Sequence, residues 1–145
     1  MTDTRRSISL TVFGLLLCAT GHAQANPQSP PPLNVVLGQT HLQLIDHTGR
    51  CALSESGKRP RELEMAWPCQ FAPDRQGSAR IETARKTPVA LVMRSEPQSP
   101  PETGCLTQTQ AVRLINGQLE TSVRMDTAGC GYGADQKVFV GLFDW

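Results

Sequence analysis

Aromatic residues, and any excess of charge of one sign, are scarce in this sequence. Phe, Trp and Tyr make up 5% of the chain, and 14 Lys and Arg against 13 Asp and Glu leave a formal net charge of +1. So balanced a chain is neither a strongly basic nucleic-acid-binding protein nor an acidic disordered tail. We therefore expect no nucleic-acid partner, and a mainly aliphatic core that disulfides help to stabilise.

Catalytic and metal-binding motifs are also missing. The chain has no G-x-S-x-G elbow, no G-x-x-x-x-G-K-[ST] loop and no C-x-x-C pair. After residue 25 its histidines are His41 and His47, and Asp46 would point to the opposite face of a strand from its neighbour His47. We expect no catalytic residue, metal site or cofactor, and keep a small envelope hydrolase as the alternative to a non-catalytic protein.

Residues 1–25 have the three parts of a secretory signal peptide. Arg5 and Arg6 supply a positive start, a short and mostly apolar run follows, and Ala23 and Ala25 are small residues before a cleavage site. The apolar run is too short and too interrupted for a membrane-spanning helix. We expect cleavage after residue 25 and a periplasmic or secreted protein. The arginine pair leaves general secretion and twin-arginine export both open.

Cysteine spacing predicts how the exported chain is cross-linked. Cleavage removes Cys18 and leaves an even set, namely Cys51, Cys69, Cys105 and Cys130. An even number of cysteines in an exported chain indicates disulfides, and these spacings are not those of zinc modules. We therefore expect two structural disulfides.

The pairing of these cysteines follows from a predicted hairpin. Asn116-Gly117 is a preferred two-residue turn, and it would place Arg113 opposite Glu120 on paired strands. Extending this ladder brings Cys105 near Cys130, with a two-residue offset that a nearby glycine or a bulge can absorb. We predict Cys105–Cys130 and, by elimination, Cys51–Cys69. The other connectivities stay open.

Short strands separated by turns dominate the rest of the chain. Residues 26–32 read as a Pro-rich leader, and 33–145 as one disulfide-stapled domain. Strands are expected at 33–37, 41–46, 51–53, 79–84 with Ile81 pointing inward, and 89–93, the last buried on both faces. Residues 54–63 read as a polar loop. Residues 138–143 fit a helix and a strand equally well.

This pattern predicts a mainly β fold, a small antiparallel β-sandwich or barrel with two disulfides, and it leaves open one short C-terminal helix. Such a chain suits an exported, non-catalytic binding module of the inhibitor, immunity or envelope-accessory kind. Its partner would be a protein, or another component, in the envelope or outside the cell. A structural or stress-related envelope protein is a further alternative. Arg, Trp and Tyr dominate binding hot spots, so the expected contact residues are Arg59, Arg61, Trp67 and Tyr132.

Overall fold

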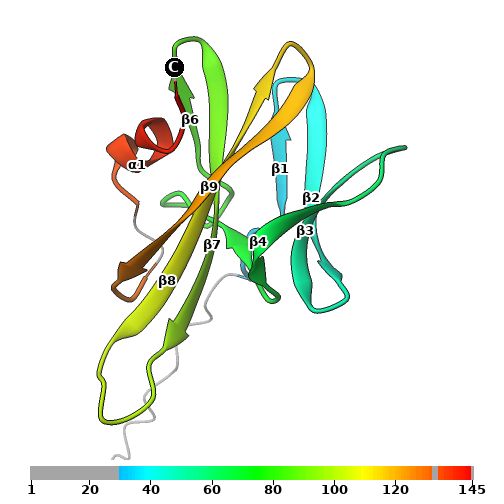
Figure 1. Cartoon of the computed structure of the whole chain (residues 1–145). Helices are drawn as coiled ribbons and strands as arrows, with labels where there is room; N and C mark the ends of the chain where they lie inside the picture. Colours follow the sequence, from blue (N-terminus) through cyan, green and yellow to red (C-terminus); the bar gives the residue numbers. More distant parts are fainter. Residues whose placement is uncertain (1–29, 132–133, 145) are drawn as a thin grey trace, which may run out of the picture.

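The computed structural model describes residues 30–131 and 134–144 of the chain (Figure 1). The expected signal peptide, most of the expected leader and Tyr132 lie outside these residues. The elements run in the order β1 (Asn34–Leu37), β2 (Thr40–His47), β3 (Arg50–Glu55), β4 (Arg61–Ala66), β5 (Gln70–Phe71), β6 (Ile81–Ala84), β7 (Thr87–Pro97), β8 (Cys105–Ile115), β9 (Gln118–Ala128) and α1 (Gln136–Gly141). The mainly β fold and the short C-terminal helix agree with the expectation from sequence.

The first four strands form an antiparallel meander in the order β1-β2-β3-β4, which we call the N-terminal sheet. Apolar and polar residues alternate along β2, so Leu42 and Leu44 are buried while Gln43 between them is exposed. Gly49, with a φ of 83°, allows the tight turn from β2 to β3, because glycine adopts positive φ without strain.

The remaining strands form a second antiparallel sheet, which we call the C-terminal sheet. β5 and β6 pair with one side of β7, and β8 and β9 follow on its other side. The two sheets pack against each other as a sandwich over a shared core that includes Leu44, Phe71 and Val92. In the part of the chain described, the sheets do not join into a closed barrel, so the sandwich is the correct one of the two expected architectures.

The β8–β9 hairpin confirms the predicted register. Arg113 lies opposite Glu120 beyond the Asn116-Gly117 turn, and both turn residues have positive φ. Farther along, the register shifts by one residue, because two residues of β9, Ser122 and Val123, lie opposite Ala111 of β8. The Ser122 hydroxyl accepts the Ala111 N–H at 2.9 Å, so the bulge leaves that donor satisfied.

Both disulfides join the predicted partners. Cys105–Cys130 links the open end of the β8–β9 hairpin, and the bulge absorbs one residue of the expected offset. Cys51–Cys69 links β3 to the residue before β5, so it connects the N-terminal sheet to the chain entering the C-terminal sheet. Disulfides of this kind are typical of an oxidising environment outside the cytoplasm.

Strand β7 is buried on both faces, as its apolar run predicts. Ala90 and Val92 face the N-terminal sheet, whereas Val89, Leu91 and Met93 face helix α1. The C-terminal segment, which fits a helix and a strand equally well in the sequence, forms helix α1.

Asp135 caps α1 by accepting the Lys137 N–H at 3.2 Å. Phe139 of the helix is fully buried against the sheet, with the Arg80 guanidinium 4.8 Å from the centre of its ring. The helix thus covers the face of the C-terminal sheet that the N-terminal sheet leaves open.

Two expectations about local structure were wrong. The polar loop expected at 54–63 is confined to 56–60, because β4 begins at Arg61 and buries Leu63 and Met65 on alternate positions. Ile81, expected to point inward, is 42% exposed. It lies opposite Ala90, but β6 is at the edge of its sheet, so Ile81 lines an open groove.

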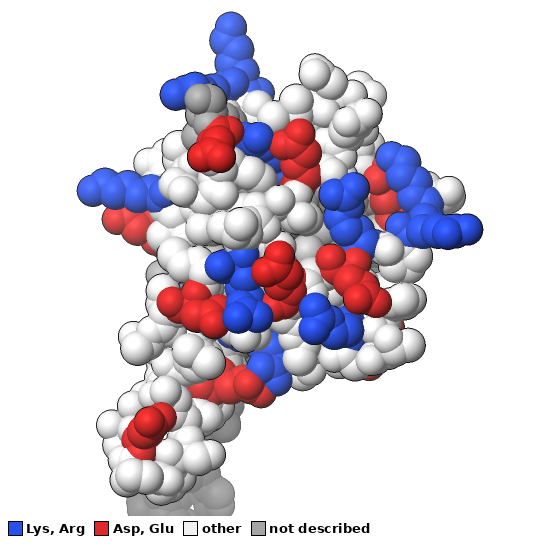
Figure 2. All heavy atoms as spheres, in the orientation of Figure 1, with Lys and Arg blue, Asp and Glu red and all other residues white. Residues whose placement is uncertain are grey.

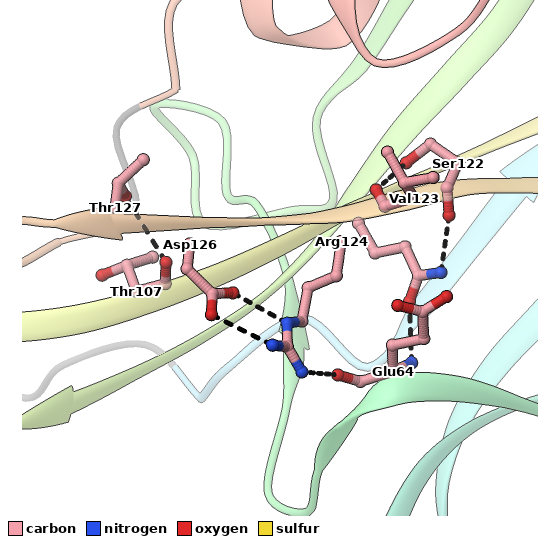
Figure 3. A network of polar contacts seen from close by, with 8 residues as sticks. Glu64, Thr107, Ser122, Val123, Arg124, Asp126 and Thr127 are labelled. Atoms are coloured by element: carbon pink, nitrogen blue, oxygen red, sulfur yellow. Dashed lines mark hydrogen bonds and ion pairs between the residues drawn. The ribbon is translucent and has the colours of Figure 1, made fainter.

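Side chains of the C-terminal sheet form hydrogen bonds with backbone groups at the outer edge of β4 (Figure 3). The Glu64 N–H donates to Gln110 Oε1 at 2.9 Å, and the Glu64 carbonyl accepts from Arg124 Nη1 at 2.9 Å. The amide nitrogen of Gln110 donates to the Ser122 carbonyl at 2.7 Å. Gln110 is 2% exposed, so one buried amide joins β4 to the β9 bulge.

The substitution Gln110→Leu should therefore destabilise the protein by roughly 2 kcal/mol, since it leaves the Glu64 N–H and the Ser122 carbonyl without a buried partner. The partly exposed Arg124→Leu should cost under about 1 kcal/mol. Urea unfolding of both variants measures the difference. Equal losses would show that the buried amide has no special part in holding β4.

The two disulfides should differ in their accessibility to reductant. Cys51 is fully buried and Cys69 is 5% exposed, whereas Cys130 lies at the surface. Brief treatment of the native protein with a water-soluble phosphine, followed by alkylation and mass spectrometry, should label Cys105 and Cys130 first. Simultaneous labelling of both pairs would contradict this order.

Candidate functional site

The structure brings together two of the four expected contact residues and separates a third. Arg59 lies in the loop between β3 and β4, and Arg61 begins β4. Trp67 follows the opposite end of the same strand, where it is half-buried against the core between the sheets. The backbone N–H of Trp67 donates to the Gly49 carbonyl at 3.0 Å. A binding role for Trp67 or for Tyr132 stays a prediction.

Arg59 and Arg61 line a small cleft between the β3–β4 hairpin and the β8–β9 turn. Its volume is about 230 Å³. Leu53 and Leu119 supply an apolar lining. Leu53 belongs to the core between the sheets, and the partly buried Leu119 packs against that core. The other lining residues are Glu55, Lys58, Gly117 and Gln118. We call this feature the arginine cleft.

Local contacts hold both walls of the arginine cleft. On one wall, the backbone N–H of Lys58 donates to the Glu55 carbonyl at 3.1 Å. The Lys58 ammonium also pairs with the Glu55 carboxylate at 2.7 Å. On the other, the Asn116-Gly117 turn ends a regular ladder, in which Leu114 lies opposite Leu119. The cleft is therefore built on hairpins whose register is set elsewhere in the two sheets.

The guanidiniums of Arg59 and Arg61 are exposed, and within residues 30–131 and 134–144 neither makes a hydrogen bond or an ion pair. Other arginines are held by the fold: Arg50 donates to the Leu63 carbonyl at 3.0 Å, and Arg113 pairs with Glu120 at 2.9 Å. In Figure 2, basic side chains project from the right-hand margin, where Figure 1 places the β3–β4 loop.

A second, larger groove of about 520 Å³ lies beside β1, β2 and the segment leading into β6. It contains His41 together with Ser54, Ser56 and Ser78, and none of the described residues that line it is Asp, Glu, Lys or Arg. A serine hydrolase needs a hydroxyl hydrogen-bonded to a histidine that a third group orients. In the part of the chain described, His41 makes no such bond, so this groove lends the hydrolase alternative no geometric support.

The other histidine lies outside both clefts. His47 Nδ1 contacts the Glu62 carboxylate at 2.8 Å, and both side chains are nearly half exposed. Among the described residues, no group of three His, Cys, Asp or Glu side chains is placed to hold a metal ion. Nor does that part of the chain contain a helix long and apolar enough to cross a membrane.

The contribution of the β8–β9 turn to the arginine cleft was not predicted from the sequence. Asn116-Gly117 correctly indicated a hairpin, but nothing in the sequence indicates that Gln118 and Leu119 meet the β3–β4 loop. The two hairpins belong to different sheets, so only the packing of the sheets brings them together.

Comparison of the chain with protein-family models, with curated proteins and with solved structures found no match. The function of the chain must therefore be inferred from its own residues and their arrangement.

The two kinds of arginine should respond differently to truncation. Arg59→Ala and Arg61→Ala should each change the free energy of unfolding by less than about 0.5 kcal/mol, because neither guanidinium makes a hydrogen bond or an ion pair with another described residue. Arg113→Ala should cost about 1–2 kcal/mol, since its guanidinium is largely buried, pairs with Glu120 and stacks 4.1 Å from the Phe143 ring. Denaturant unfolding of the three variants tests this. A loss at Arg61 as large as that at Arg113 would mean that Arg61 has a structural role.

Proposed function

We propose that this chain is an exported, non-catalytic binding module that recognises another protein through the arginine cleft. The observation that carries the proposal is the pair of arginines, Arg59 and Arg61, whose guanidiniums are exposed and unpaired within the described chain. Arginine is among the residues that contribute most to protein interfaces.

The rigidity of the scaffold supports the same proposal. Cys51–Cys69 links β3 to the residue before β5. The β8–β9 turn holds one wall of the cleft in a defined register, and the Glu55–Lys58 contacts hold the other. A preorganised surface loses little conformational entropy when a partner binds, so more of its contact energy appears as affinity.

Export supports the choice of partner. The disulfides suit an oxidising compartment, and the N-terminal residues have the pattern of a cleaved signal peptide. The proposed module is therefore periplasmic or secreted, and its partner is a protein of the envelope or of the extracellular medium.

Capture experiments with matched variants test this function. Immobilised, oxidised protein comprising residues 26–145 should retain one stoichiometric partner from envelope extract or culture fluid. The double variant Arg59→Ala/Arg61→Ala should bind that partner at least about tenfold more weakly, because hot-spot truncations cost 2 kcal/mol or more.

The control variant is Arg85→Ala/Lys86→Ala. These two basic residues form the β6–β7 turn and are also exposed, but they do not line the arginine cleft. This variant should capture the partner as well as the unaltered protein does. Equal capture by all three proteins would refute the proposal that the cleft is the binding surface.

A further inference from the structure

The arginine cleft combines positive charge with an apolar lining. Lys58 and Glu55 neutralise each other across 2.7 Å, so the charge left for a ligand is that of Arg59 and Arg61. Guanidinium groups are planar, always charged and shaped to bind a carboxylate through two parallel hydrogen bonds. The cleft therefore complements a planar anion such as a carboxylate.

The remaining lining residues restrict which anion fits. Leu119, which is only partly buried, offers an apolar surface that methylene groups can cover. The amide of the Gln118 side chain can both donate and accept hydrogen bonds. These features favour a carboxylate on an aliphatic stem over inorganic phosphate, which has no apolar part.

The size of the cleft points in the same direction. About 230 Å³ is less than the roughly 300–1,000 Å³ of pockets that enclose drug-sized molecules. It suits one side chain projecting from a larger partner. An aspartate or glutamate side chain has both the charged end and the aliphatic stem that the lining requires.

We infer that the arginine cleft is a recognition pocket for an acidic side chain, best matched by glutamate, on the surface of a protein partner. This inference rests on the proposed function, because it assumes that the cleft faces a protein. In the bound state, Arg59 and Arg61 donate to the carboxylate while the methylene groups of the acidic side chain cover Leu119.

Nuclear magnetic resonance titration tests the pocket without the partner. The probe is N-acetylglutamic acid α-amide, added to the oxidised protein labelled with ¹⁵N. We expect saturable shifts of the Arg59 and Arg61 Nε–H signals and of the Gln118 amide, with millimolar affinity that weakens as sodium chloride is added. The neutral N-acetylglutamine amide should cause no saturable shift at these positions.

Two variants separate the pocket from nonspecific attraction. Arg61→Gln should weaken probe binding at least fivefold, with well-dispersed amide signals confirming that the variant is folded. Arg85→Gln, which alters a basic residue outside the cleft, should leave the titration unchanged. A loss of binding that is equal in both variants would overturn the inference, because it would indicate a general charge effect.

Other anions test whether the pocket prefers a side-chain carboxylate to a terminal carboxylate or a phosphate. N-acetylleucine, which carries only a terminal carboxylate, and inorganic phosphate should both bind more weakly than the glutamate probe. Equal or tighter binding of either would overturn the assignment to an acidic side chain. If the probe does not bind but partner capture still depends on Arg59 and Arg61, this inference fails and the proposed function stands. If the probe binds but no protein is captured, the proposed function fails.

Discussion

Burial of strand β7 on both faces is the constraint on which the other parts of the structure depend. Its central residues are all buried, with Ala90 and Val92 directed to one core and Val89, Leu91 and Met93 to the other. Exposing either face would return a row of apolar side chains to water, at about 1.5–3 kcal/mol for each of the larger ones. The N-terminal sheet must therefore cover one face, and helix α1 must cover the other.

The position of the arginine cleft follows from this packing. The N-terminal sheet carries the β3–β4 loop, and the C-terminal sheet carries the β8–β9 turn, so the cleft exists only because the two sheets lie together. Cys51–Cys69 and the buried Gln110 amide both connect the sheets, one at β3 and the other at β4. The arginine cleft is thus a property of the assembled sandwich and not of either hairpin alone.

Local chemistry explains the features that sequence reasoning predicted correctly. Asn116-Gly117 favours one turn, that turn sets the register that places Arg113 opposite Glu120, and the register brings Cys105 close to Cys130. Strand β4 was missed because Leu63 and Met65 are its only large apolar residues, among charged neighbours. Ile81 was misjudged because alternation indicates which face a side chain takes, but not whether another sheet covers that face.

Residues close in the chain, or a simple apolar pattern, were enough to predict the β-rich class, the main hairpin and the double burial of 89–93. They also predicted the two disulfide pairs that the structure has, while the other connectivities stayed open. Tertiary structure alone decided that the sheets form a sandwich, that the C-terminal segment is a helix, and that Arg59 and Arg61 share a cleft with Gln118 while Trp67 does not. These outcomes depend on contacts between segments far apart in the chain. The energy of such contacts comes from shape and burial in the folded state, which no local pattern encodes.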